Sequence, residues 1–343
     1  MSNMTKRGFL ASNFNLKKTM ESGQVFGWRH IAGVTPNTDE YRIVSGSRAC
    51  IAVGDQRGAN CYIELYYADI DGEYDYWIHY FGLDDRGEMA RIYAETMLVM
   101  LEDKWPLTRA LRGTEGIRVM CEDPWQAMVA SFMPDTWSVE TRRANLMRMI
   151  GASMRAANKY SAEHEWCFPC AENLLAIPMS APPMSKIGPK IQRMCKEVIA
   201  KNIVPYDWTR EAGAPVHEAV VNTKLLTGLS MNAIVRLAIT GFHYDNIYTE
   251  ECVTTAWLAL NMDEINQYEK DRCDMYGTDY SCKSLLYLRI RYAGFVLAKE
   301  RAAAKAERLK ARNTAKEPEG CTKGTTKKKS GRKAKVKEAV VGA

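Results

Sequence analysis

The chain has 343 residues, of which 46% are hydrophobic and eight are tryptophan, so it can bury one large core or two ordinary ones. Its net charge is +6, but residues 299–343 carry a net +10 and residues 1–298 a net −4. No run of about 18 apolar residues is present and the first residues lack an apolar segment, so we expect neither a membrane span nor a secretory signal. These features favour a cytoplasmic or nucleoid-associated protein (nuclear in a eukaryote), which is not secreted.

The first 110 residues are predicted to form an antiparallel sheet domain that also contains helices. Residues 1–12 read as a loose lead-in, and residues 14–29 as an extended segment because glycines flank an apolar run. Three runs of strand-forming residues, separated by turns rich in glycine and serine, follow at 41–44, 49–53 and 61–67. The apolar spacing then becomes helical, which predicts helices over 76–81 and 88–104.

Residues 111–312 are predicted to form an all-helical domain, which makes the fold class α+β. Apolar spacing and proline positions place the helices at 125–132, 139–158, 171–176, 190–201, 218–226, 231–240, 252–260 and 285–312. Residues 313–343 are rich in lysine and poor in apolar residues, which predicts a disordered basic tail. The tail suits non-specific contact with phosphates, although a solubilising role is the plainer alternative.

The ten cysteines are scattered, as expected of reduced thiols in a chain that needs no disulfides. Cys167 and Cys170 form a single C-x-x-C pair without a partner pair, and we interpret them as structural. The sequence therefore predicts no metal site and no cofactor.

The stretch Leu225–Cys252 has the pattern helix, glycine turn, helix, and then two carboxylates, Glu250 and Glu251. A turn at Gly228 followed by a helix N-terminus can present backbone N–H groups to a phosphate, and a carboxylate can stabilise a developing sugar cation. Each feature also has a plainer explanation: Gly228 as a helix C-cap, and the glutamates as acids that a helix dipole favours. Asp245 is a further candidate acid.

Several strings resemble the 8-oxoguanine DNA glycosylases of the helix-hairpin-helix superfamily and occur in the order of that family. They are FNLKKTMESGQVFGWR, YFGLDDRGEMARIYAE, GIRVMCEDPWQAMVASFM, CFPCAENLLA, SKIGPKIQRM and RYAGFVLA, and they span nearly all of the chain before the tail. The resemblance implies a β-rich N-terminal domain, a two-lobed helical domain and a base pocket between them. It also implies double-stranded DNA as the partner and flipping of one nucleotide. We expect a monomer.

The resemblance also implies which residues form the site. The family's nucleophilic lysine falls on Asn232, and its essential aspartate on Glu251 with Glu250 beside it. The residues implied to contact the base or the DNA are Gly23, Phe26, Trp137, Arg142, Gly228, Ser230 and Arg301. Among them, Trp137 would wedge into the gap left by the flipped base, and Arg142 would face the orphaned partner base. Core packing and surface ion pairs are the plainer alternatives for these two side chains.

An asparagine at position 232 cannot form a Schiff base, so we expect a glycosylase that hydrolyses the N-glycosidic bond with water and lacks lyase activity. Arg301 and Leu297 replace an aromatic ring and a polar contact of the family, so a modified base other than 8-oxoguanine is expected. Two alternatives stay open. One is a non-excising enzyme of base hypermodification, such as that of modified thymine in phage or other viral DNA. The other is a catalytically inactive DNA reader.

Overall fold

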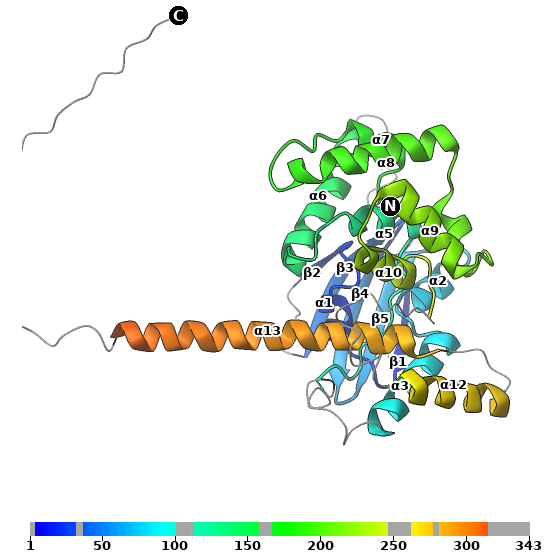
Figure 1. Cartoon of the computed structure of the whole chain (residues 1–343), viewed down its shortest axis with the longest axis vertical. Coiled ribbons are helices and arrows are strands. Elements are labelled where there is room, and N and C mark those ends of the chain that lie inside the picture. Colours follow the sequence, from blue (N-terminus) through cyan, green and yellow to red (C-terminus); the bar gives the residue numbers. More distant parts are fainter. Residues whose placement is uncertain are drawn as a thin grey trace, which may run out of the picture. The chain divides into compact units, whose positions relative to one another are not determined.

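The computed structural model describes residues 4–31, 37–100, 111, 113–157, 167–245, 262–276 and 281–314 (Figure 1). Met1–Leu297 form one compact unit and Ala298–Ala343 a second. The first unit joins a five-stranded antiparallel sheet to a set of helices, which confirms the α+β fold class. Within the described ranges, no helix has the length and apolar character needed to cross a membrane.

The sheet has the strand order β1-β5-β4-β3-β2. Its strands are β1 (Met4–Ala11), β2 (Trp28–Ile31), β3 (Thr38–Ser45), β4 (Arg48–Arg57) and β5 (Asn60–Ala68). Along β5 every second residue is buried, from Cys61 to Tyr67, because successive side chains point to opposite faces of a strand. The buried face packs with α1 and α2 into a core that contains Trp77 and Tyr80. The three predicted strands 41–44, 49–53 and 61–67 are confirmed, each as part of a longer strand.

Two expectations for the first 31 residues were wrong. Residues 4–11 form β1, which pairs with β5 from Met4 opposite Ala68 to Ala11 opposite Cys61, so the strand depends on a partner distant in sequence. Residues 16–21 form the helix α1 (Leu16–Glu21) inside the segment predicted to be extended. The helix begins because the Asn15 side chain accepts a hydrogen bond from the N–H of Lys18, at 2.8 Å.

The helices of the first unit follow the predicted order. They are α2 (Glu73–Tyr80), α3 (Asp85–Met100), α5 (Pro124–Ser131), α6 (Val139–Ala157), α7 (Ala171–Ala176), α8 (Gly188–Lys201), α9 (Val216–Thr227), α10 (Met231–Thr240), α12 (Met262–Tyr276) and the first part of α13 (Lys283–Thr314), with 3₁₀ turns at Met184–Lys186 and Pro205–Trp208. The predicted helix 252–260 and most of the predicted tail lie outside the described residues. Helix α12 was not predicted, because it is polar and, among its described side chains, buries only Ile265 and Tyr268.

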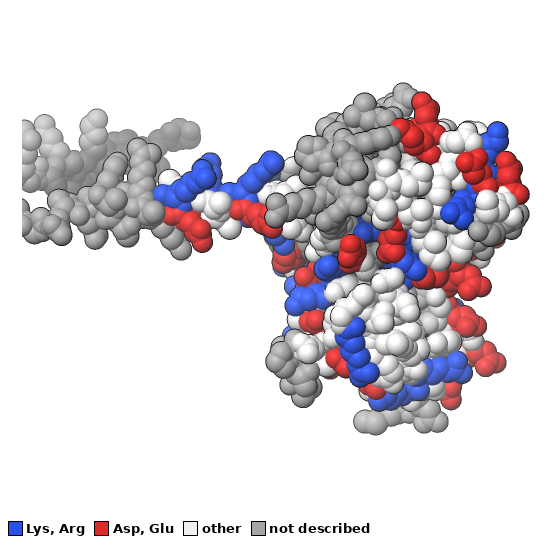
Figure 2. Space-filling model, turned by 90° about the horizontal axis from the view of Figure 1, so that it is seen from below, with Lys and Arg blue, Asp and Glu red and all other residues white. Residues whose placement is uncertain are grey.

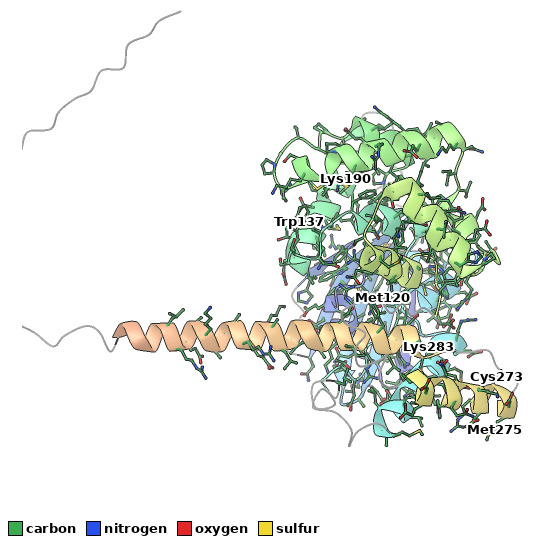
Figure 3. All side chains as sticks on the ribbon, in the orientation of Figure 1. Met120, Trp137, Lys190, Cys273, Met275 and Lys283 are labelled. Atoms are coloured by element: carbon green, nitrogen blue, oxygen red, sulfur yellow. The ribbon has the colours of Figure 1, made fainter. Side chains whose placement is uncertain are left out.

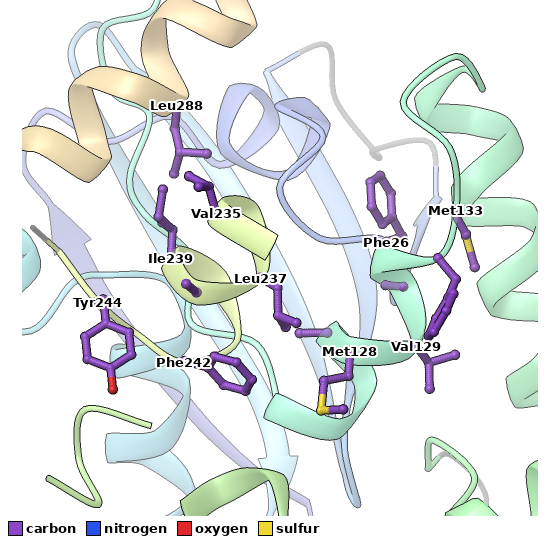
Figure 4. Packing of buried hydrophobic residues seen from close by; sticks show 14 of the residues in the cluster. Phe26, Met128, Val129, Met133, Val235, Leu237, Ile239, Phe242, Tyr244 and Leu288 are labelled. Atoms are coloured by element: carbon purple, nitrogen blue, oxygen red, sulfur yellow. The ribbon is translucent and has the colours of Figure 1, made fainter. Parts of the chain in front are cut away.

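A second core lies among the helices. Figure 4 shows part of it, where Leu237 of α10 points toward Met128 of α5, and Val235 of α10 lies near Leu288 of α13. Phe26, from the sheet region, belongs to the same core.

Gln126 of α5 ties the sheet to the helices. Its buried side chain donates to the Val44 carbonyl at 2.8 Å and accepts from the Gly46 N–H at 3.1 Å. It also donates to the Glu122 carboxyl at 2.7 Å. The backbone N–H of Glu122 in turn donates to the Thr240 carbonyl at the end of α10, at 2.7 Å. A side chain at Gly27 would collide with Gln126 and Val44, so glycine is required there.

The buried Glu122 predicts a pH-dependent stability. Burial raises its pKa to about 8. The folded protein holds the proton of Glu122 more tightly than the unfolded chain, whose glutamate has a pKa of about 4.3. The resulting stabilisation is complete below about pH 4.3 and is lost as the pH rises through about 8. We expect Glu122→Gln to flatten the fall of the free energy of unfolding between pH 6 and 9, by up to about 1.4 kcal/mol per pH unit. Urea titrations across this range measure the slope.

Glu64→Gln is the matched control, since it also removes one carboxylate. The hydrogen bond from Lys6 lowers the pKa of Glu64, so its contribution changes only at acidic pH. Equal slopes for the wild type and Glu122→Gln between pH 6 and 9 would contradict the prediction.

Candidate functional site

The hairpin consists of α9, a glycine turn and α10. Helix α9 ends at Gly228, which has a φ of +63° and donates its N–H to the Lys224 carbonyl at 2.9 Å. Ser230 is the N-cap of α10 and accepts from the N–H of Ala233 at 3.4 Å. The turn geometry needs glycine at 228, and the cap needs a short polar side chain at 230. The role of these two residues in binding phosphate stays a prediction.

Asn232 is the second residue of α10 and is half-buried. Its side-chain oxygen, Oδ1, is buried and has no hydrogen-bond partner in the described part of the chain. Arg236 lies one turn later on the same face of the helix, and its Nη2 is likewise buried and without a partner there. Buried polar atoms without partners are costly. One acceptor and one donor without partners thus lie a helical turn apart, and both are covered from solvent in this conformation.

Three guanidinium groups meet at Asp135, in the loop between α5 and α6. Arg142 donates to its Oδ1 at 3.1 Å, Arg236 pairs with the same oxygen, and Arg291 of α13 lies 3.4 Å from its Oδ2. We call these four residues the Asp135 cluster. Three positive charges face one negative charge, so the cluster has a net charge of about +2 and attracts anions.

The charges of the Asp135 cluster are held in place by one another. Burial acts to raise the pKa of Asp135, but Arg236, Arg291 and Arg142 outweigh it and hold that pKa below its ordinary value. Burial lowers the pKa of Arg142 to about 10, which leaves the guanidinium charged at neutral pH. The arginine side chains are only 2%, 4% and 12% exposed, whereas Asp135 is 37% exposed.

The residues predicted on the sheet side of the pocket lie next to this cluster. The Phe26 ring is buried and lies 5.1 Å from the guanidinium carbon of Arg142. Gly23 has a φ of +79°, and a Cβ there would lie 3.1 Å from Val139, the first residue of α6. The structure thus brings the segment between α1 and β2, which carries Gly23 and Phe26, against the helix that carries Arg142.

Trp137 lies in the same loop as Asp135, and Figure 3 labels it beside α6. It is half-buried against the helical core, and its carbonyl accepts from Nε of Arg142 at 3.1 Å. Arg142 therefore fixes the loop that carries Trp137. The predicted contacts of Trp137 with the base gap and of Arg142 with the partner base stay predictions.

The remaining predicted residues are Glu250, Glu251, Asp245 and Arg301. Glu250 and Glu251 lie outside the described residues. Asp245, the further candidate acid, pairs with Arg86 at 2.6 Å and with Arg210 at 3.5 Å. Arg301 lies on the exposed part of α13 that belongs to the second unit.

A cavity of about 530 Å³ lies apart from these residues. It is lined by residues near the end of β4, by α3 and by Arg289 of α13. Among the described residues, its lining includes no predicted site residue. The candidate site therefore consists of the hairpin and the Asp135 cluster.

Sequence reasoning missed Asp135, Arg236 and Arg291. The spacing of four residues between Asn232 and Arg236 could have placed both on one helix face. Asp135 and Arg236 are 101 positions apart, so no local pattern could pair them.

Comparison with known proteins adds a family match and solved structures. Residues 8–128 match the family described as 8-oxoguanine DNA glycosylase, N-terminal domain. The structure of MBOgg1 in complex with a low-affinity DNA ligand is 17% identical, with 86% of this chain and 99% of that chain covered and a TM-score of 0.56. The chain has the fold of the 8-oxoguanine DNA glycosylases.

Two further structures share this glycosylase fold. The 8-oxoguanine glycosylase/lyase of Clostridium acetobutylicum, in complex with double-stranded DNA containing cytosine opposite 8-oxoG, is 14% identical, with 88% of this chain and 98% of that chain covered and a TM-score of 0.56. The 3-methyladenine DNA glycosylase of Archaeoglobus fulgidus is 13% identical, with 85% and 99% covered and a TM-score of 0.50. No curated protein sequence matches the chain.

Proposed function

We propose that this glycosylase-fold protein binds double-stranded DNA, flips a modified nucleotide out of the stack and hydrolyses its N-glycosidic bond without a Schiff base. The observation that carries the proposal is Asn232, which occupies the start of α10 directly after the glycine turn and leaves its amide oxygen buried without a partner in the described chain. The family match and the DNA bound in two similar structures support DNA as the substrate.

In the proposed reaction a carboxylate stabilises the positive charge that develops on the sugar, and water attacks it. Glu251 or Glu250 supplies the carboxylate. The Asn232 amide oxygen accepts a hydrogen bond from the attacking water or from the sugar. The ammonium group of a lysine could only donate one. The Asp135 cluster supplies positive charge for the DNA backbone next to this position.

In this proposal the basic C-terminal residues supply the long-range electrostatic attraction to DNA. On the face shown in Figure 2, basic and acidic side chains of the described residues are interspersed, and residues 1–298 carry a net charge of −4. Residues 299–343 carry a net +10. A basic segment makes binding strongly dependent on salt. We propose a monomeric protein that acts where DNA is, in the cytoplasm, the nucleoid or the nucleus.

Asn232 also favours a second function. A site without an amine nucleophile suits an enzyme that holds a flipped base and changes it without excision, or a protein that only reads it. The same experiment separates these functions.

The test uses duplexes that carry a panel of damaged and modified bases. For the correct base we expect strand breaks only after alkali, because hydrolysis leaves an abasic site that alkali cleaves. We also expect no adduct trapped by borohydride above the background of the other lysines. Glu250→Gln and Glu251→Gln should each be compared, and loss of excision in one of them identifies the carboxylate.

Each outcome has one meaning for the proposal. A changed base without an abasic site favours the non-excising enzyme, and binding without reaction favours the reader. A strong trapped adduct with the wild type would overturn the assignment of Asn232. Full excision in both glutamine variants would overturn the assignment of the carboxylate.

A further inference from the structure

Three metal-ligating side chains meet away from the hairpin site. His79 lies near the end of α2, Cys121 in the segment that leads to α5, and His243 in the turn after α10. One ligand atom from each lies within 4.8 Å of the others. All three residues are half-buried, so the group lies at the edge of the core and is accessible to a small ion.

The two imidazole rings are oriented as metal ligands are. Nδ1 of His79 is 2.8 Å from the Asp84 carboxylate, and Nε2 of His243 is 3.0 Å from the Glu122 carbonyl. Because these two oxygens accept hydrogen bonds, the proton of each ring lies on the nitrogen that faces the oxygen. The other nitrogen of each ring then presents its lone pair to the second histidine. The inner nitrogens, Nε2 of His79 and Nδ1 of His243, are 3.4 Å apart. Two lone pairs at this distance repel unless a cation or a proton lies between them.

Glu211 lies beside the two histidines, outside the group of three, and its Oε1 also accepts from Nη2 of Arg210 at 2.8 Å. Its Oε2 is 3.0 Å from Nδ1 of His243, and its Oε1 is 4.0 Å from Nε2 of His79. In a tetrahedral zinc site the bonds of about 2.0–2.3 Å place neighbouring ligand atoms roughly 3.3–3.8 Å apart. The separations of 3.0 Å and 3.4 Å at Nδ1 of His243 come close to those of a zinc site, whereas the group that includes the cysteine sulfur spans up to 4.8 Å and must contract around an ion.

Cys121 can serve as the thiolate ligand. Its sulfur lies within 4.8 Å of the ligand nitrogens of His79 and His243, and a thiol loses its proton when it binds a metal ion. A thiolate and the Glu211 carboxylate together balance the charge of a divalent ion. A set of one sulfur, two imidazoles and one carboxylate suits zinc, whereas magnesium and calcium prefer oxygen ligands alone.

We propose that His79, Cys121, His243 and Glu211 bind one zinc ion that clamps four separate segments together. His243 has a φ of +61°, which is uncommon for a residue with a side chain, and this conformation directs the chain as it leaves α10. The ion joins that turn to α2, to the segment before α5 and to the loop after the 3₁₀ turn Pro205–Trp208. With four protein ligands the site is closed, so its role is structural.

The test is a cobalt titration of the full-length protein after removal of metal under reducing conditions. We expect one Co²⁺ per chain, with a thiolate-to-cobalt charge-transfer band and the intense visible bands of a tetrahedral site. Zinc should displace the cobalt and raise the thermal midpoint. Wild-type protein that stays folded and gives no charge-transfer band would overturn the proposal, in favour of a metal-free thiolate–imidazolium pair.

Three variants locate the site. Cys121→Ser should lose the charge-transfer band. The double variant Cys167→Ser with Cys170→Ser, which removes the C-x-x-C pair, should keep it. Asp84→Asn keeps all four ligands but weakens the acceptor behind His79, and should lower zinc affinity about 10- to 100-fold. Loss of the band in the double variant, or an unchanged zinc affinity in both Cys121→Ser and Asp84→Asn, would overturn the assignment.

Discussion

Asp135→Ala is expected to lower the free energy of unfolding by about 3 kcal/mol. The change removes the only carboxylate of the Asp135 cluster and leaves Arg142, Arg236 and Arg291 facing one another with little water around them. Breaking a buried ion pair costs about 3–5 kcal/mol because the remaining charge stays buried without compensation. The lower end of this energy range applies because the Asp135 side chain is 37% exposed. Urea unfolding at neutral pH measures the difference.

Asp55→Ala is the matched control. Asp55 is 33% exposed, close to the exposure of Asp135, and it pairs with Arg57 at 2.9 Å. Arg57 is 61% exposed, so water solvates it after the change, and a loss of about 0–1 kcal/mol is expected. Equal losses in the two variants would show that the three arginines of the Asp135 cluster find other partners, and the cluster would then not hold the loop that carries Trp137.

The predicted fold was correct where the signal is local. Runs of strand-forming residues separated by turn residues predicted β3, β4 and β5, and helical spacing predicted α5 to α10 in order. Strand β1 was missed because its stability comes from pairing with β5, and α1 was missed because one cap, Asn15, decides it. The sequence motifs that resemble the glycosylase family span nearly all of the chain before the tail. The predicted α+β class and glycosylase fold therefore did not depend on β1 or α1.

The candidate site was predictable only where its residues are close in sequence. Gly228, Ser230 and Asn232 follow one another in the hairpin and could be placed by counting. The contact between Asp135 and Arg236 spans 101 positions, and that between His79 and His243 spans 164. No spacing rule connects such residues, which is why the sequence predicted neither the Asp135 cluster nor a metal site. Glu250 and Glu251 lie outside the described residues, so their role stays a prediction.

Asn232→Lys is expected to give the protein a nucleophilic amine. Position 232 follows the glycine turn directly, and Arg236 with its cluster lies one turn away on the same helix face. Nearby positive charge lowers the pKa of a lysine, so more of the amine is neutral and able to attack an aldehyde. With duplex DNA that carries one abasic site, we expect borohydride to trap the variant on the order of ten times more than the wild type. Gel electrophoresis of labelled DNA measures the adduct.

Abasic DNA makes this test independent of which base the protein recognises. Leu225→Lys is the control, because Leu225 is 80% exposed on α9 and the change adds the same charge to the same hairpin. Lysines elsewhere in the chain set a background that both variants share. If Leu225→Lys traps as much DNA as Asn232→Lys, the hairpin does not direct position 232 at the sugar, and the amide of Asn232 then has no part in the proposed hydrolysis. A selective gain at 232 places that amide beside the reacting carbon, where it can position water but cannot form a bond.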